Sequence, residues 1–236
     1  MDSPTPAQLP ELLHGLATTR AIRRYTDETI PDDALRDILF AATRAPSGSN
    51  RQPFRFMVFS NGPRADQVKQ LIGTGARRLW DAKRTHDGYD AGSGTDQASP
   101  KARMARTMQD YVDHIDSVPV LVLACLIRYR DPSPSEGANV YPACQNLLLA
   151  ARALGYGGVL TGFQGLVEDE LRALLGLPDD VALSATITLG RPAGSHGPVR
   201  RRPMAELVFG DTWGTGARWA VDPPGTAVLS SRFGPG

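Results

Sequence analysis

Cysteine and lysine are both scarce in this sequence, and each scarcity limits the kinds of binding site that the protein can form. The 236 residues include only two cysteines, Cys125 and Cys144, too few for a disulfide framework or a metal cluster. Both lie in apolar stretches, so we expect buried free thiols. Only Lys69, Lys83 and Lys101 are lysine among the 26 basic residues. An anion site in this chain is therefore expected to consist of arginine.

The charge balance and the hydrophobic runs exclude further classes of protein. Acidic residues number 25 against 26 basic ones, and a net charge of +1 gives no reason to expect nucleic acid or a membrane surface as partner. The longest apolar run, residues 118–127, is shorter than the roughly 20 residues that span a bilayer. Residues 1–20 have neither the basic start nor the apolar stretch of a signal peptide. We therefore expect a soluble, cytoplasmic protein.

The hydrophobic pattern predicts a helix-rich α+β domain. With 41% apolar and 22% charged residues, the chain can bury a sizeable core. Apolar residues at helical spacing predict helices at about residues 7–18, 32–45, 67–82, 104–115, 138–154 and 168–175. Apolar segments bounded by turn residues predict strands at 54–60, 119–127, 157–163 and 182–189, and 204–209 is compatible with a terminal strand. The order of these elements, with few strands, is typical of an α+β fold.

Three segments of a single domain spanning residues 1–236 are expected to lack regular structure. Residues 1–10 carry three prolines and are interpreted as a loose arm. Residues 87–99 are rich in glycine, serine and aspartate, which indicates a mobile loop or a lid within 84–103. Residues 210–236 are rich in glycine and proline and predict an extended tail.

Motifs for nucleotide binding and for nucleophilic catalysis are absent from the sequence. No Gly-x-Gly-x-x-Gly follows a strand, and there is neither a Walker loop nor a Gly-x-Ser-x-Gly elbow. The four histidines do not stand at metal-ligand spacing with one another or with the cysteines. We therefore predict neither a catalytic side chain nor a metal site, and expect a cofactor to carry any chemistry.

Two arginine clusters and one polar turn remain as candidate binding elements. The clusters lie at residues 20–24 and 200–202, and together they could clamp one phosphate through bidentate bonds. The alternative is that each cluster is a solvated patch or a salt-bridge face. The turn, APSGSNRQPF at residues 45–54, offers several donors and acceptors that could contact a polar heterocycle. The alternative there is an ordinary helix-to-strand loop with local caps.

These residues resemble the FMN-dependent nitroreductase family. The segment TTRAIRRYTDETIPDDALRDILFAATRAPSGSNRQPFRFMVFS is similar to the family's N-terminal signature, an arginine-rich start followed by a helix and a Pro-Ser-Gly/Ser-x-Asn-x-Gln-Pro turn. YPACQNLLLAARALGYGGVLTGF resembles the core helix and the following glycine-rich strand. LRALLGLPDDVALSATITLGRPAG, followed by RRRPMAEL, resembles the C-terminal part. The resemblance covers about residues 12–209, and residues 87–99 match least.

The resemblance implies a three-layer sandwich in which helices flank a mainly antiparallel central sheet. It further implies an intertwined homodimer with FMN at the interface, where both chains contact the cofactor. The apolar segment 138–154 would then supply an isologous dimer face. From the residues alone, a buried monomer core is the alternative for that segment.

The resemblance also implies which residues contact FMN. By position these are Arg20, Ala21, Arg23, Pro46, Ser47, Gly48, Asn50, Gly157, Gly158 and Arg201. Serine is common in the family where Ala21 stands, so only a backbone contact is expected there.

Each group of these residues has its own expected role. Arg20 and Arg201 would hold the phosphate, although Arg200 and Arg202 leave the register open. Arg23 would face the negative charge of the reduced flavin, and Arg24 is expected to be structural or an ion-pair partner. The turn would come from the partner chain. The two glycines would let the backbone approach the flavin ring.

The activity that the resemblance implies is hydride transfer from NADH or NADPH through FMN to a small aromatic or conjugated acceptor, such as a nitroaromatic, quinone or enone. Flavin N5 would carry the chemistry in a double displacement. Residues 67–116 would shape the acceptor pocket, with Trp80 and Tyr111 as ring-stacking candidates and core packing as their alternative role. Two other functions stay open. One is an FMN-binding non-reductase that stores, senses or modifies flavin, and the other is an interaction protein whose arginines contact an acidic partner.

Overall fold

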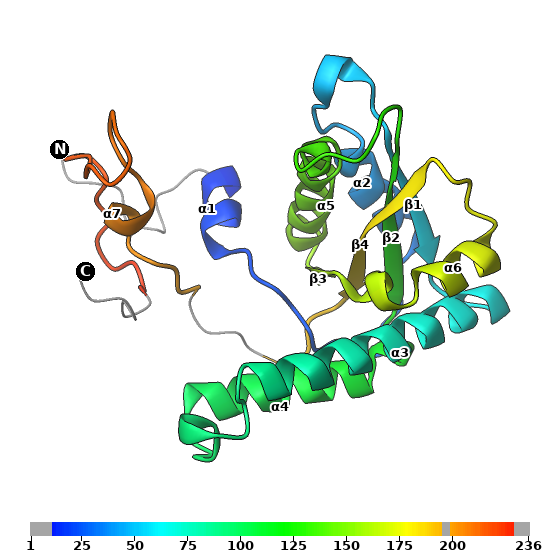
Figure 1. Cartoon of the computed structure of the whole chain (residues 1–236), viewed down its shortest axis with the longest axis horizontal. Coiled ribbons are helices and arrows are strands. Elements are labelled where there is room, and N and C mark those ends of the chain that lie inside the picture. Colours follow the sequence, from blue (N-terminus) through cyan, green and yellow to red (C-terminus); the bar gives the residue numbers. More distant parts are fainter. Residues whose placement is uncertain (1–10, 195–198, 229–236) are drawn as a thin grey trace. The chain divides into compact units, whose positions relative to one another are not determined.

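The computed structural model describes residues 11–194 and 199–228, which divide into two compact units (Figure 1). The central unit comprises Ala21–Gly194. The terminal unit comprises Met1–Arg20 together with Ser195–Gly236. The single domain expected for residues 1–236 stays a prediction. The expected arm at residues 1–10 lies outside the described residues.

Four strands form one sheet in the central unit. They are β1 (Phe54–Phe59), β2 (Val120–Ile127), β3 (Gly157–Thr161) and β4 (Val181–Gly190). The order across the sheet is β1-β2-β4-β3, and every neighbouring pair is antiparallel. The two central strands are buried at almost every position, which confirms that the apolar run ending at residue 127 is a covered central strand.

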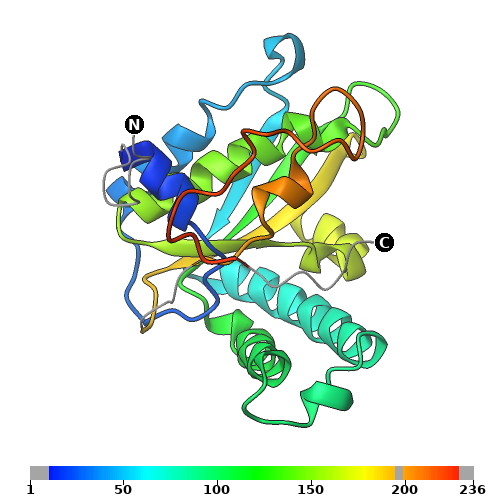
Figure 2. The same ribbon diagram turned by 90° about the vertical axis from the view of Figure 1, so that its left-hand side faces the viewer.

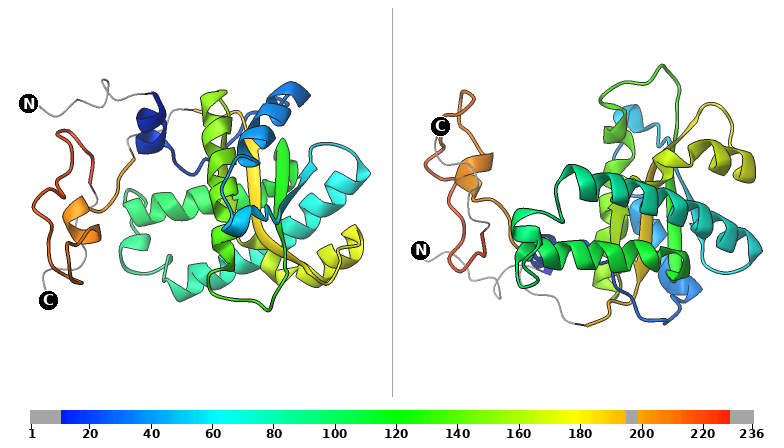
Figure 3. Two further views of the ribbon diagram at one scale, coloured as in Figure 1. Left: turned by 90° about the horizontal axis from the view of Figure 1, so that it is seen from above. Right: turned by 60° about the horizontal axis from the view of Figure 1, so that its bottom comes forward.

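Helices cover both faces of this sheet. They are α2 (Asp32–Ala42), α3 (Pro63–His86), α4 (Pro100–Asp113), α5 (Tyr141–Ala153) and α6 (Glu168–Leu175). One face packs against α2 and α5, and the other packs against α3, α4 and α6. Figure 2 shows these layers on either side of the sheet, and the right-hand view of Figure 3 shows α3 and α4 running side by side. The predicted α+β three-layer sandwich is therefore confirmed.

Residues of β2 contribute to both cores, which explains the uninterrupted apolar sequence of this strand. Val122 belongs to the cluster that contains Ile38 of α2 and Leu147 of α5, whereas Leu121 belongs to the cluster that contains Ile72 of α3. All five side chains are buried. The two predicted free thiols are confirmed, since Cys125 and Cys144 are buried and unpaired.

The bounds of several elements differ from the sequence-based expectation. The helix expected at 67–82 extends from Pro63 to His86. The helix expected at 104–115 begins at Pro100, because Ser99 caps it by accepting a hydrogen bond from the Ala102 N–H at 3.0 Å. The loop between α3 and α4 is therefore 87–99. Its Tyr89 ring packs on Trp80 with a centroid distance of 5.1 Å. A lid function for this loop stays a prediction.

The terminal unit contains α1 (Glu11–Thr18) and α7 (Met204–Leu207). The strand expected at 204–209 is thus wrong for its first four residues. Pro203 is the N-cap of α7, and the carboxylate of Asp222 accepts a hydrogen bond from the Met204 N–H at 3.0 Å. From residue 210 to 228 the chain forms turns and isolated bridges, and the extended tail expected at residues 210–236 stays a prediction.

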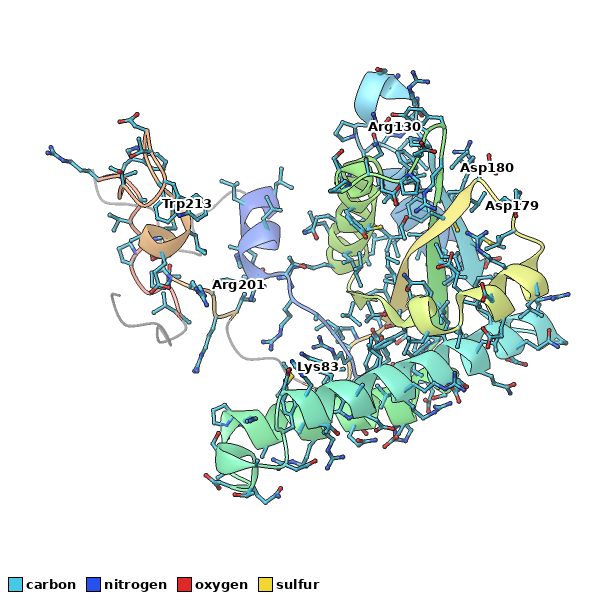
Figure 4. All side chains as sticks on the ribbon, in the orientation of Figure 1. Lys83, Arg130, Asp179, Asp180, Arg201 and Trp213 are labelled. Atoms are coloured by element: carbon cyan, nitrogen blue, oxygen red, sulfur yellow. The ribbon has the colours of Figure 1, made fainter. Side chains whose placement is uncertain are left out.

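Apolar side chains of the terminal unit are unusually exposed. Trp213 is 93% exposed and Trp219 is 71% exposed, and Leu12, Leu207 and Val228 are also exposed. Figure 4 labels Trp213 on the chain that follows α7. Within the described ranges of the chain, none of the helices is long and apolar enough to cross a membrane.

Candidate cofactor site

The segment 22–26, here called the arginine segment, is bound to the edge of the sheet. The Ile22 N–H donates to the Gly158 carbonyl of β3 at 2.9 Å. The Thr26 N–H donates to the Arg191 carbonyl just after β4, also at 2.9 Å. Tyr25 pairs with Pro192, which lies in the same extension of β4. The backbone that carries Arg23 and Arg24 is therefore held by β3 and by the end of β4.

Arg23 contains a buried donor that the described residues do not satisfy. Its Nε atom is buried and has no hydrogen-bond partner among the residues that the structure describes. A buried donor without a partner costs about 1–3 kcal/mol. The guanidinium also lies close enough to two phenols, the half-buried Tyr25 and the buried Tyr111, to influence their pKa values. Burial raises both pKa values, and the charge of Arg23 acts against that rise. The Arg23 side chain is thus suited to receive an oxygen or nitrogen acceptor of a ligand.

Arg24 is an ion-pair partner, as predicted. Its Nε atom lies 3.0 Å from a carboxylate oxygen of Asp110 on α4, and both side chains are about half exposed. A cleft of about 310 Å³ opens beside this pair, lined by Arg23, Asp110, His114 and Pro119 among others. That volume is at the lower end of the range for small-molecule sites.

The polar turn at residues 46–52 has a strained backbone. Three residues other than glycine have positive φ angles, namely Ser49 at 52°, Asn50 at 51° and Gln52 at 49°. Such left-handed conformations cost free energy and are concentrated at functional sites. The expected local caps are present, since the Ser47 hydroxyl accepts a hydrogen bond from the Gln52 N–H at 2.8 Å. The caps hold the turn but do not explain why it adopts three unfavourable conformations.

The side chain of Asn139 fixes this turn from outside. Its Oδ1 atom accepts a hydrogen bond from the Gly48 N–H at 2.9 Å. A Cβ atom at Gly48 would lie 3.2 Å from that oxygen, so a larger residue would crowd the contact. The Asn50 Oδ1 atom accepts from the Gln52 side chain at 3.2 Å. Ser47 and Asn50 therefore already use part of their hydrogen-bonding capacity within the turn.

The turn and the arginine segment lie at diagonally opposite corners of the sheet. The turn leads into β1, at one edge, whereas the arginine segment binds β3, at the other edge. Three strand spacings separate the two edges, about 14 Å. The turn also precedes Phe54, which pairs with the end of β2, and the arginine segment binds where β3 meets the end of β4. One chain therefore does not bring these two predicted elements together.

A comparison with known protein families settles the relationship of this chain. The model of the nitroreductase family matches residues 16–191. The chain belongs to the nitroreductase family. The resemblance seen in the sequence is thereby confirmed, and the oxidoreductase class with it.

Individual relatives of this nitroreductase-family chain include proteins of similar length. It is 29% identical over 206 residues to an NADH dehydrogenase of Thermus thermophilus, covering 80% of this chain and 91% of that protein. It is 25% identical over 192 residues to a putative NADH dehydrogenase/NAD(P)H nitroreductase of Methanothermobacter thermautotrophicus, covering 79% and 80%. The structure of a putative nitroreductase from Desulfovibrio desulfuricans, in complex with FMN, is 30% identical. It has a TM-score of 0.63 and covers 87% of this chain and 99% of that one.

The glycines at positions 157 and 158 are required by contacts within the chain. A Cβ atom at Gly157 would lie 2.6 Å from the Ile22 side chain, and one at Gly158 would lie 2.5 Å from the Thr188 carbonyl. Both residues are buried. The close approach that glycine permits is therefore between the arginine segment and the sheet at Gly157, and between β3 and β4 at Gly158. A contact of either glycine with a flavin ring stays a prediction.

The two arginines predicted to hold phosphate both belong to the terminal unit, and Ala21 begins the central unit. Arg201 is exposed, pairs with Val228 in an isolated bridge and donates from Nη1 to the Arg200 carbonyl at 3.0 Å (Figure 4). The role of Arg20, and the choice among the three arginines at 200–202, stay predictions.

The two aromatic residues predicted as ring-stacking candidates are core residues instead. Trp80 and Tyr111 are each 2% exposed. The Trp80 Nε1–H donates to Gln109 at 2.9 Å, and the Tyr111 ring packs near Phe163 with a centroid distance of 6.0 Å. The alternative role of core packing is therefore correct, because neither ring has a free face for a substrate.

The sequence reasoning missed a buried hydroxyl cluster beneath the arginine segment. Its members are Tyr25, Tyr111 and Thr188. The available signal was the threonine pair in the strand sequence ALSATITL, because Thr186 and Thr188 are fully buried and buried hydroxyls require partners.

Proposed function

We propose that this nitroreductase-family protein is an FMN-dependent oxidoreductase that passes hydride from NADH or NADPH to a small aromatic or conjugated acceptor. The observation that carries the proposal is the buried, unsatisfied Arg23 donor on a segment anchored to the sheet edge. The names of the relatives, an NADH dehydrogenase and an NAD(P)H nitroreductase, support the redox activity. FMN in the similar Desulfovibrio structure supports the cofactor.

The residues of the central unit suit one part of such a cofactor. Bound FMN would accept hydride from one substrate and donate it to the next at a shared site, which is a double displacement. Arg23 would place its positive charge where the reduced flavin is negative, and this charge stabilises the reduced form. No side-chain base is needed for hydride transfer, in keeping with the lack of a nucleophilic motif in the sequence.

The cofactor phosphate would be held by arginines of the terminal unit. Arg20 and Arg201 are the proposed ligands, because guanidinium groups form charge-assisted bonds to phosphate oxygens. Ala21 would offer its backbone alone. Gly157 and Gly158 are proposed to lie near the flavin ring.

The active form is proposed to be a homodimer. The strained turn with Pro46, Ser47, Gly48 and Asn50 lies at the corner of the sheet diagonally opposite the arginine segment. A second copy of the chain could bring its own turn to this arginine segment, so that both chains contact the cofactor. Exposed tryptophans in the terminal unit provide apolar surface for such an assembly.

The first test is the visible absorption spectrum of the purified protein before and after anaerobic addition of NADH or NADPH. Flavin bands that bleach are the expected result. Bands that persist would favour the alternative function, an FMN-binding non-reductase, for which the exposed Ala21 without a hydroxyl is the supporting observation. A colourless protein that does not bind added FMN would refute both functions and leave the arginines as a surface patch. A cytoplasmic location stays a prediction.

A further inference from the structure

Three hydroxyl groups, two of them buried and one half-buried, form a chain of hydrogen bonds that ends in the arginine segment. The Tyr111 hydroxyl on α4 lies 2.7 Å from the Thr188 Oγ1 atom on β4. The same Oγ1 atom lies 2.8 Å from the Tyr25 hydroxyl. The Tyr25 hydroxyl lies 2.6 Å from the Ile22 carbonyl oxygen. Tyr111 is 2% exposed and Thr188 is fully buried, so water does not compete for the bond between them, whereas Tyr25 is half-buried.

The number of available protons determines which hydroxyl group donates and which accepts in each hydrogen bond of this series. The Ile22 carbonyl can only accept, so Tyr25 donates its single hydroxyl proton there, across the shortest distance in the chain. The Tyr25 oxygen then accepts from the Thr188 hydroxyl. Because that proton is used, Thr188 accepts in turn from Tyr111. The Thr188 carbonyl is a second acceptor for Tyr25, but at 3.2 Å it is the more distant one.

The end of this chain fixes the peptide group that leads into Arg23. The Ile22 carbonyl belongs to the peptide bond between Ile22 and Arg23, and Tyr25 holds it. The Ile22 N–H is held by the Gly158 carbonyl at 2.9 Å. Burial raises the pKa of both phenols, so both remain protonated at neutral pH and the donors stay in place.

We propose that Tyr25, Thr188 and Tyr111 are positioning residues that hold Arg23 in the conformation required for the cofactor. The hydrogen bonds link α4 to the arginine segment through β4. A substitution on α4 would therefore affect the conformation of Arg23 although the substituted residue does not contact Arg23. The expected effect on FMN affinity rests on the proposed function. The expected effect on the conformation of the arginine segment is independent of that function.

Two isosteric variants test the direction in which the hydroxyl groups donate their hydrogen bonds. Tyr25→Phe removes the bond to the Ile22 carbonyl and leaves the Thr188 proton without its acceptor. Tyr111→Phe removes only the first donor, and the bonds of Thr188 and Tyr25 remain. We expect the FMN Kd to rise about 5- to 15-fold in Tyr25→Phe, the effect of one lost hydrogen bond with an uncompensated carbonyl. Tyr111→Phe is expected to raise the Kd only about 2- to 3-fold.

Two control variants separate positioning from general stability. Val112→Ala truncates a fully buried side chain next to Tyr111 on α4 and removes no hydroxyl. Tyr141→Phe removes an exposed phenol that donates to the Ser184 carbonyl at 3.3 Å. Neither is expected to change the FMN Kd or the reduction potential of the bound flavin. Tyr25→Phe is expected to change both, because Arg23 is displaced.

A second readout needs no cofactor. Arg23 and Arg24 are trypsin sites, so limited proteolysis of the full chain without FMN reports how firmly the arginine segment is held. We expect cleavage at these two residues to accelerate in Tyr25→Phe more than in Tyr111→Phe. Cleavage elsewhere should change no more than in Val112→Ala.

The outcomes distinguish this inference from the proposed function. If the wild-type chain does not bind FMN but Tyr25→Phe still speeds cleavage after Arg23 and Arg24, the proposed function fails and the positioning chain stands. If the wild type binds FMN and Tyr25→Phe matches it in Kd, potential and cleavage, the positioning chain is refuted. Equal losses in Tyr25→Phe and Val112→Ala would also refute it, because they would show an effect of stability alone.

Discussion

The glycine at position 157 offers a sharp test of how the arginine segment is seated on β3. A methyl group in Gly157→Ala would lie 2.6 Å from Cγ1 and 3.0 Å from Cβ of Ile22, and 3.1 Å from Cγ of Pro192. These atoms belong to a branched side chain and a ring on segments that are hydrogen-bonded to the sheet. They cannot move aside as the end of a flexible side chain would. Either the arginine segment detaches from β3, or the steric strain lowers the free energy of unfolding.

The expected loss of stability follows from these contacts. Overpacking of a well-packed site costs about 1–3 kcal/mol. If the segment moves, the hydrogen bond between Ile22 and Gly158 is lost as well, at about 0.5–1.5 kcal/mol. We therefore expect the free energy of unfolding to fall by about 2–4 kcal/mol. The control is Gly162→Ala, where a methyl group would meet nothing within 4 Å, and its effect should stay within about 0.5 kcal/mol.

The assay is urea denaturation followed by circular dichroism at a fixed protein concentration, since the proposed dimer would make the apparent stability concentration-dependent. Adding Ile22→Ala removes the Cγ1 atom that clashes. The double variant should therefore cost at least about 1 kcal/mol less than the sum of the two single variants. Strict additivity, or equal effects of Gly157→Ala and Gly162→Ala, would refute this account of the glycine.

Three further predictions concern the thiols, the tail and the phosphate. Burial raises the pKa of Cys125 to about 11 and that of Cys144 to about 12, so neither should react with iodoacetamide at pH 8 unless urea is added. Because the unfolded chain loses these protons first, stability should decline as the pH rises from about 9 toward 11, and a pH-independent urea midpoint over that interval would contradict the assignment. Deleting residues 210–236 should weaken the dimer in sedimentation equilibrium, and an unchanged dimer constant would exclude a role for the tail. Arg20→Ala and Arg201→Ala should each weaken FMN binding by about 1.5–3 kcal/mol, and a titration that shows no loss in either would remove the phosphate clamp.

Local sequence patterns predicted the elements whose bounds depend on nearby residues. The helix at 168–175 was predicted with its observed bounds, because Gly176 ends it with a left-handed φ of 62°. The apolar run of β2 indicated a strand covered on both faces. By contrast, α7 depends on Asp222, which lies 18 residues beyond the N–H that it accepts from. Hydrophobic periodicity does not predict a contact between residues so far apart in the sequence.

The candidate site was predicted as a set of residues but not as an arrangement. The sequence indicated the arginines and the polar turn, yet only the strand order β1-β2-β4-β3 shows that they lie at opposite corners. The sequence also did not indicate the contact that requires glycine at position 157, where Ile22 fills the space that a side chain would need. The link from Tyr111 to Tyr25 spans 86 positions and passes through Thr188, so only the fold reveals it.

The place of the arginine segment on β3 has a consequence for aggregation. β3 is an edge strand, and an edge with unpaired N–H and C=O groups can recruit a strand from another molecule. By accepting the Ile22 N–H, the Gly158 carbonyl is already occupied within the chain. Variants that loosen the segment would expose this edge and promote insolubility, and through the contact proposed for Arg23 the same change would weaken cofactor binding. Selection for a soluble, well-paired sheet edge and selection for Arg23 in its place would then act on the same short stretch of backbone.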